Sequence, residues 1–472
     1  MRFSTKTNVL NGGITVDTFL ASSFGTVLMT LFQDIFSVPS WQSFTYLAYG
    51  WSLAWGRQTI TTYLWLSGAT QVKHFWRYYA FLGGALYKGR YRLWAQVIRL
   101  AASFIAGDEV ITVCIDDHTA KKSGPHIEGR DRYRNSAGSA RQEYRVLAGI
   151  NLVLGIMRIP LKRWPGHHLS VPIGCEIYLK EKLARRLRLP YRSRSQLARC
   201  IIDLVASTLP KRYIRVEGDG EFATRAFLQD LPPRVEVVGR FLITSKLYEP
   251  PLKATRKRRG APRKKGDLIG SAKTLATCPS GWQPHPTEAG ALVQRWCGIW
   301  HSVLPGRIIQ VVLVRRPHLE NCRTAKGKHV FGRQKPLEAF FSTDVALSLA
   351  HVLNAYQERW AIEIDIRDER AFNGLAQDQC RKLTHIVGVN TFRLLMAATR
   401  TLWFIEQSER SGSVELCRFR PWYVKKVAPS QFDVVWSCRE TLHEAGIFPI
   451  PRFFPDLTKN QQAIDATLQP AA

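Results

Sequence analysis

Apolar runs separated by polar turns divide the middle of the chain into alternating strands and helices. Nearly continuous apolar runs are typical of strands that are covered on both faces. They predict strands at residues 109–116, 144–159, 171–179, 213–217 and 235–244, the second of which also fits a hairpin. Helices are predicted at 196–207, with Ser193 as N-cap, and near 221–231, after a Gly-Asp-Gly turn. We therefore expect an α/β core.

The first 108 residues are predicted to form helices rich in tryptophan and tyrosine. The segments 59–66 and 71–82, separated by Ser67 and Gly68, have the spacing of a helix-turn-helix, although most helix pairs of this kind only pack together. The uncharged stretch 35–56 contains serine, proline and glutamine. We therefore expect it to be a buried helix and not a membrane span.

The composition changes after residue 246. Residues 253–265 contain eight lysines or arginines together with a glycine and a proline, which predicts a mobile basic loop. A strand is expected at 307–315 and a long helix at 345–372. The tail after residue 408 contains several prolines and is expected to end in disorder.

These elements divide the chain into five expected regions. A helical domain comes first, followed by the first part of the core, an insertion with the basic loop, the part of the core with the long helix, and a C-terminal region. Their expected limits are 1–108, 109–246, 247–340, 341–400 and 401–472. A chain of 472 residues with 45% apolar content is long enough for two or three folded domains.

Charge narrows the class of partner. The chain has 67 lysines and arginines against 37 acids, a formal net charge of +30, so its expected partner is a polyanion: DNA, RNA or an anionic membrane. The nine cysteines form no C-x-x-C pair, which disfavours a zinc ribbon and indicates reduced thiols in the cytosol. Residues 1–13 lack the apolar core of a secretion signal.

Four polar side chains are predicted to share one face of the helix at 345–372. Tyr356, Arg359, Glu363 and Arg370 are spaced three, four and seven residues apart, which places them within roughly a 60° arc. A carboxylate among cations suits a metal ion acting on a nucleic-acid phosphate, although a solvated helix surface is the alternative. The apolar stripe expected to pack on a sheet consists of Leu353, Trp360 and Ile364.

Acidic residues end or flank three of the predicted elements. Asp116 and Asp117 follow the first strand, Asp219 follows the fourth, and Glu363 lies on the helix. Two magnesium ions about 4 Å apart, held by such oxygen ligands, activate a nucleophile and neutralise charge on a phosphate. Taken singly, an aspartate at a strand end is more often a turn former or helix cap. Only the joint occurrence of these acids in a strongly basic chain favours a catalytic site.

On these residues the chain resembles the DDE-type transposases of bacterial insertion sequences. It is most similar to the members with a Tyr-x2-Arg-x3-Glu-x6-Lys signature and a large insertion before the glutamate. Here the signature consists of Tyr356, Arg359, Glu363 and Arg370, with an arginine in place of the usual lysine. Both are phosphate-binding cations, although arginine is planar and bidentate.

The resemblance covers about residues 109–385 and includes blocks around the other two acids. The block 115–129 resembles the one that commonly reads Asp-Asp-Thr, with His118 where the threonine is expected. The blocks 216–222 and 341–344 resemble the surroundings of the second acid and the approach to the helix.

The resemblance implies an RNase H-like fold: a mixed five-stranded sheet with helices on both faces and a β-rich lobe inserted before the helix. It also implies that Asp116, Asp219 and Glu363 hold two Mg²⁺ ions, with Mn²⁺ as a substitute. Asp117 is the alternative first ligand, since neighbours on a strand point to opposite faces. Asp116 is favoured, because the family's first acid usually stands two places before the threonine. Glu217 is a weaker rival of Asp219.

The implied reaction is cleavage at the ends of an insertion sequence, followed by joining of the freed 3′-hydroxyl to target DNA. The implied partners are double-stranded DNA, whose transposon ends residues 1–108 would bind, and a second copy of the chain. The implied location is the bacterial cytoplasm at the nucleoid, and no membrane is expected as a partner. Phosphate contacts are expected from Tyr356, Arg359, Arg370 and the basic loop. The loop residues are Arg256, Lys257, Arg258, Arg259, Arg263, Lys264 and Lys265.

Two other functions fit the same residues. A catalytically inactive DNA-binding derivative of a transposase would keep the fold and the charge, and the departures at His118 and Arg370 leave room for it. A structure-specific nuclease on the same fold would cleave DNA without joining it.

Overall fold

The computed structural model describes residues 16–54, 56–134, 146–251, 263–316, 337–411, 416 and 425–447. Part of the predicted basic loop lies outside the described residues, namely Arg256, Lys257, Arg258 and Arg259. The predicted disorder at the end of the tail also concerns residues outside this part of the chain.

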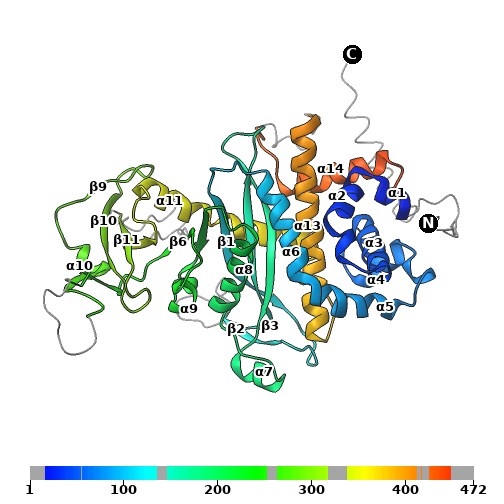
Figure 1. Ribbon diagram of the computed structural model, residues 1–472, viewed down its shortest axis with the longest axis horizontal. Coiled ribbons are helices and arrows are strands. Elements are labelled where there is room, and N and C mark those ends of the chain that lie inside the picture. Colours follow the sequence, from blue (N-terminus) through cyan, green and yellow to red (C-terminus); the bar gives the residue numbers. More distant parts are fainter. Residues whose placement is uncertain are drawn as a thin grey trace, which may run out of the picture.

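The described residues form a mixed α/β fold around one large sheet (Figure 1). The sheet has 12 strands, and its main path is β2-β3-β1-β5-β6-β12-β11-β10-β7-β8, with β4 paired to β3 and β9 to β10. The strands in chain order are β1 Ile111–Lys121, β2 Asp131–Arg134, β3 Val146–Pro160, β4 His168–Tyr178, β5 Ile214–Gly218, β6 Val235–Arg240, β7 Lys246–Tyr248, β8 Leu268–Ser271, β9 Gln283–Pro284, β10 Leu292–Ile299, β11 Ile308–Arg315 and β12 Leu337–Ser342.

The apolar runs predicted as strands are strands, with shifted ends. β1 pairs in parallel with β5, β5 in parallel with β6, and β1 antiparallel with β3. β1 continues five residues beyond its predicted end, because its pairing with β3 extends to Lys121 opposite Gly149. The two aspartates of β1 therefore lie within a paired strand and not in a turn.

The prediction of a five-stranded sheet is wrong. β12 pairs antiparallel with β6, and β11 and β10 follow on, so the strands of the insertion continue the same sheet. An unpaired β6 would expose a row of backbone N–H and C=O groups, and β12 satisfies them. Figure 1 shows β10 and β11 in green at the end of the molecule opposite the N-terminal helices.

Helices cover the sheet, and the N-terminal helices form a further layer at one end of the molecule. They are α1 Val16–Ala21, α2 Ser23–Phe32, α3 Val38–Leu53, α4 Ile60–Leu66, α5 Phe75–Phe81, α6 Tyr87–Ser103, α7 Glu181–Arg186, α8 Arg194–Thr208, α9 Arg225–Leu228, α10 Ala272–Leu275, α11 Leu349–Glu358, α12 Ala361–Phe372, α13 Leu383–Ser411 and α14 Gln431–Glu444. The predicted N-cap Ser193 is confirmed, because its hydroxyl accepts from the backbone N–H of Gln196 in a capping box. The predicted helix near 221–231 is instead a 3₁₀ turn, η4 (Gly220–Phe222), followed by the short α9.

The two faces of the sheet contribute to different apolar clusters. On β6, Val237 belongs to the large cluster that includes α6, α8 and α13, whereas its neighbour Val238 packs with Val352 and Leu353 of α11. This alternation follows from the two-residue period of a strand. It places α11 on the face of the sheet opposite α8.

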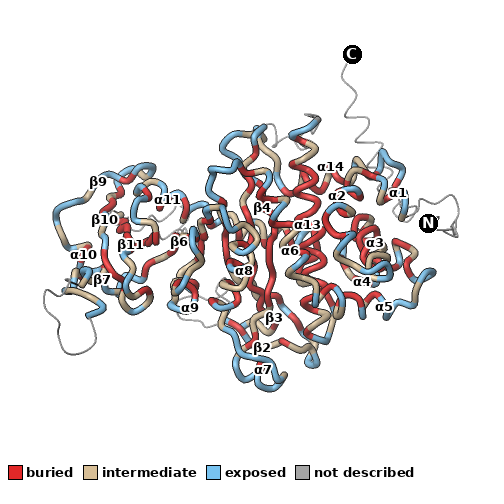
Figure 2. The backbone as a smooth tube through the Cα atoms, in the orientation of Figure 1, coloured by how far each residue is buried: buried red, intermediate tan, exposed pale blue. Residues whose placement is uncertain are grey.

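α13 is the most buried helix of the described structure. It lies between the sheet and the N-terminal helices, contacting β4 and α6 on one side and α2 on the other (Figures 1 and 2). Large apolar side chains such as Phe392, Trp403 and Phe404 are almost fully buried in it. The N-terminal helices thus share one continuous apolar cluster with α13 and the strands.

The helix pair at the predicted helix-turn-helix is shorter than expected. α4 ends at Leu66, a 3₁₀ turn follows Gly68, and α5 begins only at Phe75. Gly68 has a φ of 65°, a left-handed conformation that favours glycine.

The predicted helix at 345–372 is two helices. α11 ends at Glu358 and α12 begins at Ala361, with hydrogen bonds from the N–H of Ile362 to Arg359 and from that of Glu363 to Trp360 across the junction. These bonds span three residues, so the helix tightens there.

The apolar stripe predicted on this helix is therefore only partly right. Leu353 is buried, but Trp360 is 58% exposed and Ile364 is 42% exposed, because the junction turns them away from the sheet.

A close backbone contact fixes α13 against the helix that precedes α6. A Cβ on Gly388 would lie 2.0 Å from the carbonyl oxygen of Leu82, whereas one on Gly89 of α6 would meet nothing within 4 Å. We predict that Gly388→Ala lowers the free energy of unfolding by about 1–3 kcal/mol or more, as overpacking does. Gly89→Ala should leave it unchanged or raise it by up to about 1 kcal/mol, because alanine is the better helix former. Urea denaturation of both variants checks this, and equal stability of the two would contradict the contact.

Candidate active site

Asp116 lies on the sheet face that carries α11. In the register of the sheet, Cys114 of β1 lies opposite Glu217 of β5, and Glu217 lies opposite Val238 of β6. Val238 packs against α11, and paired residues point to the same face. Asp116, two residues beyond Cys114, shares that face.

One guanidinium connects Asp116 to Glu363. Nη1 of Arg359 is 3.4 Å from Oδ2 of Asp116, and Nη2 of Arg359 is 3.2 Å from Oε1 of Glu363. Arg359 is buried and stands at the junction of α11 and α12, 243 residues from Asp116 in the sequence. The fold thus brings two of the three predicted acids to opposite ends of the same cation.

Asp219 lies near the same cation, at the end of β5. It begins the 3₁₀ turn η4, and its Oδ1 accepts from the N–H of Gly220 at 2.6 Å. Burial alone would lower the pKa of Arg359, but Tyr356, Asp116 and Asp219 together raise it. Asp219 is therefore close enough to act electrostatically on the guanidinium.

Burial is the main reason that the pKa of Asp116 is raised to about 7. The negative charges of Asp117 and Asp219 raise it further, while the N–H of Asp117 and the cation of Arg359 lower it. The Asp116 carboxylate is thus costly to ionise even beside Arg359. A further positive charge nearby would stabilise its ionised form.

Asp117 belongs to a different cluster on the other face of the sheet. Its Oδ2 accepts from the side-chain amide of Asn151 and lies 3.5 Å from Nε of Arg194, at the start of α8. Arg194 also pairs with Glu221. Asp117 is therefore held away from Arg359 and Glu363, and Asp116 is the acid of this pair that faces them.

Glu217, the rival of Asp219, is 2% exposed. Its Oε2 accepts from the thiol of Cys114 at 3.4 Å, and burial raises its pKa to about 7. It lies in the wall beneath the site and is closed to a ligand from solvent.

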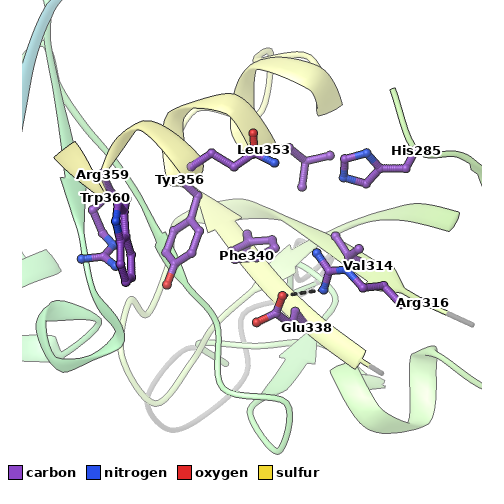
Figure 3. Close-up of a pocket in the computed structure, with 10 residues that line it drawn as sticks. His285, Val314, Arg316, Glu338, Phe340, Leu353, Tyr356, Arg359 and Trp360 are labelled. Atoms are coloured by element: carbon purple, nitrogen blue, oxygen red, sulfur yellow. Dashed lines mark hydrogen bonds and ion pairs between the residues drawn. The ribbon is translucent and has the colours of Figure 1, made fainter. Parts of the chain in front are cut away.

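Tyr356, Arg359 and Trp360 lie next to one another at one end of a pocket of about 270 Å³, with His285 at the other end (Figure 3). The ring of Tyr356 is 4.4 Å from that of Phe340, centroid to centroid. The predicted face of Tyr356 and Arg359 therefore opens on a cavity and is not a uniformly solvated surface. Trp360 was assigned to the packing face, so sequence reasoning missed its place in this pocket.

Arg370 is exposed on α12, beside β1. Burial and the charge of Arg370 together lower the pKa of His118 to about 4. His118 is two residues beyond Asp116 and on the same face of β1. Arg370 thus adds a positive charge beside β1, on the same helix as Glu363.

The described part of the basic loop belongs to the insertion. Arg263 and Lys264 are exposed, and Nζ of Lys265 lies 3.9 Å from the ring centroid of Tyr248 on β7. No described contact links Lys265 to the three acids.

The carboxylates suit a hard divalent cation, because all the donors are oxygen atoms. As arranged here, however, no group of three Asp, Glu, His or Cys residues among the described ranges is close enough to hold one metal ion. Arg359 neutralises two of the acids directly. The residues therefore fit magnesium by chemistry, but would need the guanidinium to leave.

No protein-family model matches the chain, and no curated protein has a significantly similar sequence. Within the described ranges, every helix is too short or too polar to cross a bilayer.

The buried Glu369 makes the stability of the protein depend on pH, which tests how α12 is packed. Glu369 is 6% exposed and accepts from the amide of Asn373 at 2.9 Å, and burial raises its pKa to about 8. Because the folded pKa lies above the ordinary value near 4.5, the folded state binds more protons between these values. We predict that stability falls as pH rises from about 5 to 8, and that Glu369→Gln removes this part of the loss.

The measurement is urea unfolding of both proteins at pH 5 and pH 8. At pH 5 they should be nearly equal, because Glu369 is then protonated and resembles glutamine. At pH 8 the variant should be more stable by a few kcal/mol, since one pKa unit corresponds to about 1.4 kcal/mol. A constant difference between the proteins at both pH values would contradict the assignment.

Proposed function

We propose that this chain is a DDE-type DNA transposase with an RNase H-like core, and that Asp116, Asp219 and Glu363 form its catalytic acids. The supporting observation is that Arg359 joins Asp116 to Glu363, although these residues come from distant parts of the chain. Carboxylates with perturbed pKa values that gather around one buried cation are typical of functional sites.

The order of strands supports the RNase H-like part of the proposal. Across one half of the sheet the neighbouring strands are β4-β3-β1-β5-β6. β3 is antiparallel to both β4 and β1, whereas β1, β5 and β6 are parallel to one another. The expected RNase H-like core is a mixed five-stranded sheet, and these five strands form such a set. In this proposal, β12 and its neighbours are an insertion that extends the sheet.

The side chains would act as follows. Asp116, Asp219 and Glu363 would hold two Mg²⁺ ions, which would supply activation of a water or 3′-hydroxyl and neutralisation of charge on the phosphate. Arg359 leaves the carboxylates and binds a phosphate of the DNA, where Tyr356 and Arg370 bind neighbouring phosphates. The chain would bind transposon ends and target DNA as a homodimer at the bacterial nucleoid.

An inactive DNA-binding protein is the second candidate, and one observation favours it. Arg359 already neutralises two of the acids, as a protein without metal chemistry requires. A strand-transfer assay distinguishes a structure-specific nuclease from a transposase. The nuclease would cleave DNA ends but join none of them.

The first test is cleavage and strand transfer with Mg²⁺ and the DNA ends that flank the gene. We predict that Glu363→Gln lowers both activities more than about 100-fold, since even residues that only orient metal ligands contribute about 10–100-fold. Glu358→Gln is the matched control, because Glu358 pairs with Arg158 on a partly exposed surface. The assignment of Glu363 is wrong if its variant keeps the activity of the control.

The second test is metal binding without DNA. We predict that Arg359→Ala tightens Mn²⁺ binding by about tenfold or more, which is about 1.4 kcal/mol, because it frees Asp116 and Glu363 from a competing cation. Arg367→Ala removes the same charge from exposed α12, where Arg367 pairs with Asp368, and should change the affinity little. Titration followed by Mn²⁺ paramagnetic resonance checks both. The inactive-protein alternative predicts no Mn²⁺ binding by either variant.

A further inference from the structure

A second cationic pocket lies beyond the far end of β1. Its volume is about 500 Å³, and it is lined by residues from three separate parts of the chain. Arg57 precedes α4, Lys121 ends β1, and Arg381 precedes α13; all three are exposed. None of the residues proposed above for catalysis or phosphate contact lines this pocket.

Internal contacts hold the floor of the pocket. Lys122 is buried, lies 3.1 Å from Asp378, and also donates to the backbone oxygen of Ala376 at 2.9 Å. Asn390 of α13 donates to Asp378 at 2.9 Å. Asp378, the one acid among the described lining residues, is therefore committed to these partners, and the pocket keeps the charges of Arg57, Lys121 and Arg381.

Gln377 joins this pocket to the surface near the catalytic acids. Its Oε1 accepts from the N–H of Gln58 at 3.0 Å, and its Nε2 donates to the backbone oxygen of Arg370 at 2.9 Å. Arg370 in turn lies beside His118. The segment between α12 and α13 thus connects the end of α12, beside β1, to the pocket.

The distance along β1 suits a DNA duplex. Lys121 is five residues beyond Asp116, so its side chain leaves the opposite face of β1, roughly 17 Å along the strand at about 3.3 Å per residue. Duplex DNA rises about 3.4 Å per base pair along its axis, so a duplex lying along β1 would cover this length with about five base pairs, roughly half a helical turn.

We propose that this pocket, formed by Arg57, Lys121 and Arg381, binds backbone phosphates of the DNA duplex whose cleaved bond would lie at Asp116. The inference rests on the proposed function, since it places a second contact on the same DNA. Three cations without a competing acid bind phosphate oxygens, and each phosphate contact releases counterions. The pocket would fix the register of the DNA about five nucleotides from the cleaved bond.

The test compares two double variants of the full chain in binding a labelled 30-base-pair duplex between 50 and 200 mM salt. Arg57→Ala with Arg381→Ala should reduce the slope of log affinity against log salt by about 2, since each lost contact with B-DNA changes it by about 0.9. Lys182→Ala with Lys382→Ala removes the same charge from exposed residues that do not line the pocket. This control should keep the wild-type slope.

Three results would overturn the proposal: equal slopes in both double variants, no duplex binding by the wild-type protein, or pocket-dependent binding of inorganic pyrophosphate with an unchanged duplex slope. The last result would indicate a site for small anions. Cleavage at saturating DNA separates this proposal from the catalytic one. The pocket variant should cleave at the wild-type rate there, whereas Glu363→Gln should bind the duplex normally and cleave nothing.

Discussion

The ion-pair bridge from Asp116 through Arg359 to Glu363 is the interaction on which the account of this molecule depends. Three like charges in a partly buried space repel one another, and burial already raises the pKa of Asp116 to about 7. A positive group among them is therefore a physical requirement of the fold. In the structure that group is a guanidinium, and in the proposed reaction the same carboxylates would hold divalent cations.

The bridge forms because the chain bends where it does. α11 packs its apolar side chains against the sheet, the helix tightens at Arg359 and Trp360, and α12 then runs beside β1. Arg359 is buried at this bend and reaches acids on both sides, while Trp360 is turned outward. A continuous straight helix would have packed Trp360 on the sheet, as the apolar spacing predicted.

Local patterns in the sequence predicted the strands of the core and the cap at Ser193, because these depend on neighbouring residues. The bend at Arg359 was not predictable in this way, since nothing in the local sequence breaks the helix and tertiary packing decides its direction. The extension of the sheet by β12 was also missed. Pairing of β12 with β6 joins residues about a hundred positions apart, and no local pattern reports such a contact.

The choice between Asp116 and Asp117 illustrates the same division. Strand periodicity showed that only one of them faces the helix, but not which one. The register of β1 and β5, together with the ion pair of Asp117 with Arg194, places Asp117 on the opposite face. Side chains that anchor Asp117, such as Asn151, carried no signal in the sequence, because a polar residue within an apolar strand has many possible roles.

The most direct measurement is a crystal structure of the protein with Mn²⁺ and a DNA duplex, in which anomalous scattering locates the metal. The account predicts metal within about 2.2 Å of oxygens of Asp116, Asp219 and Glu363, close to the ideal distance for magnesium. It also predicts that Arg359 has moved to a phosphate of the DNA. Manganese bound elsewhere, with Arg359 still between Asp116 and Glu363, would contradict it.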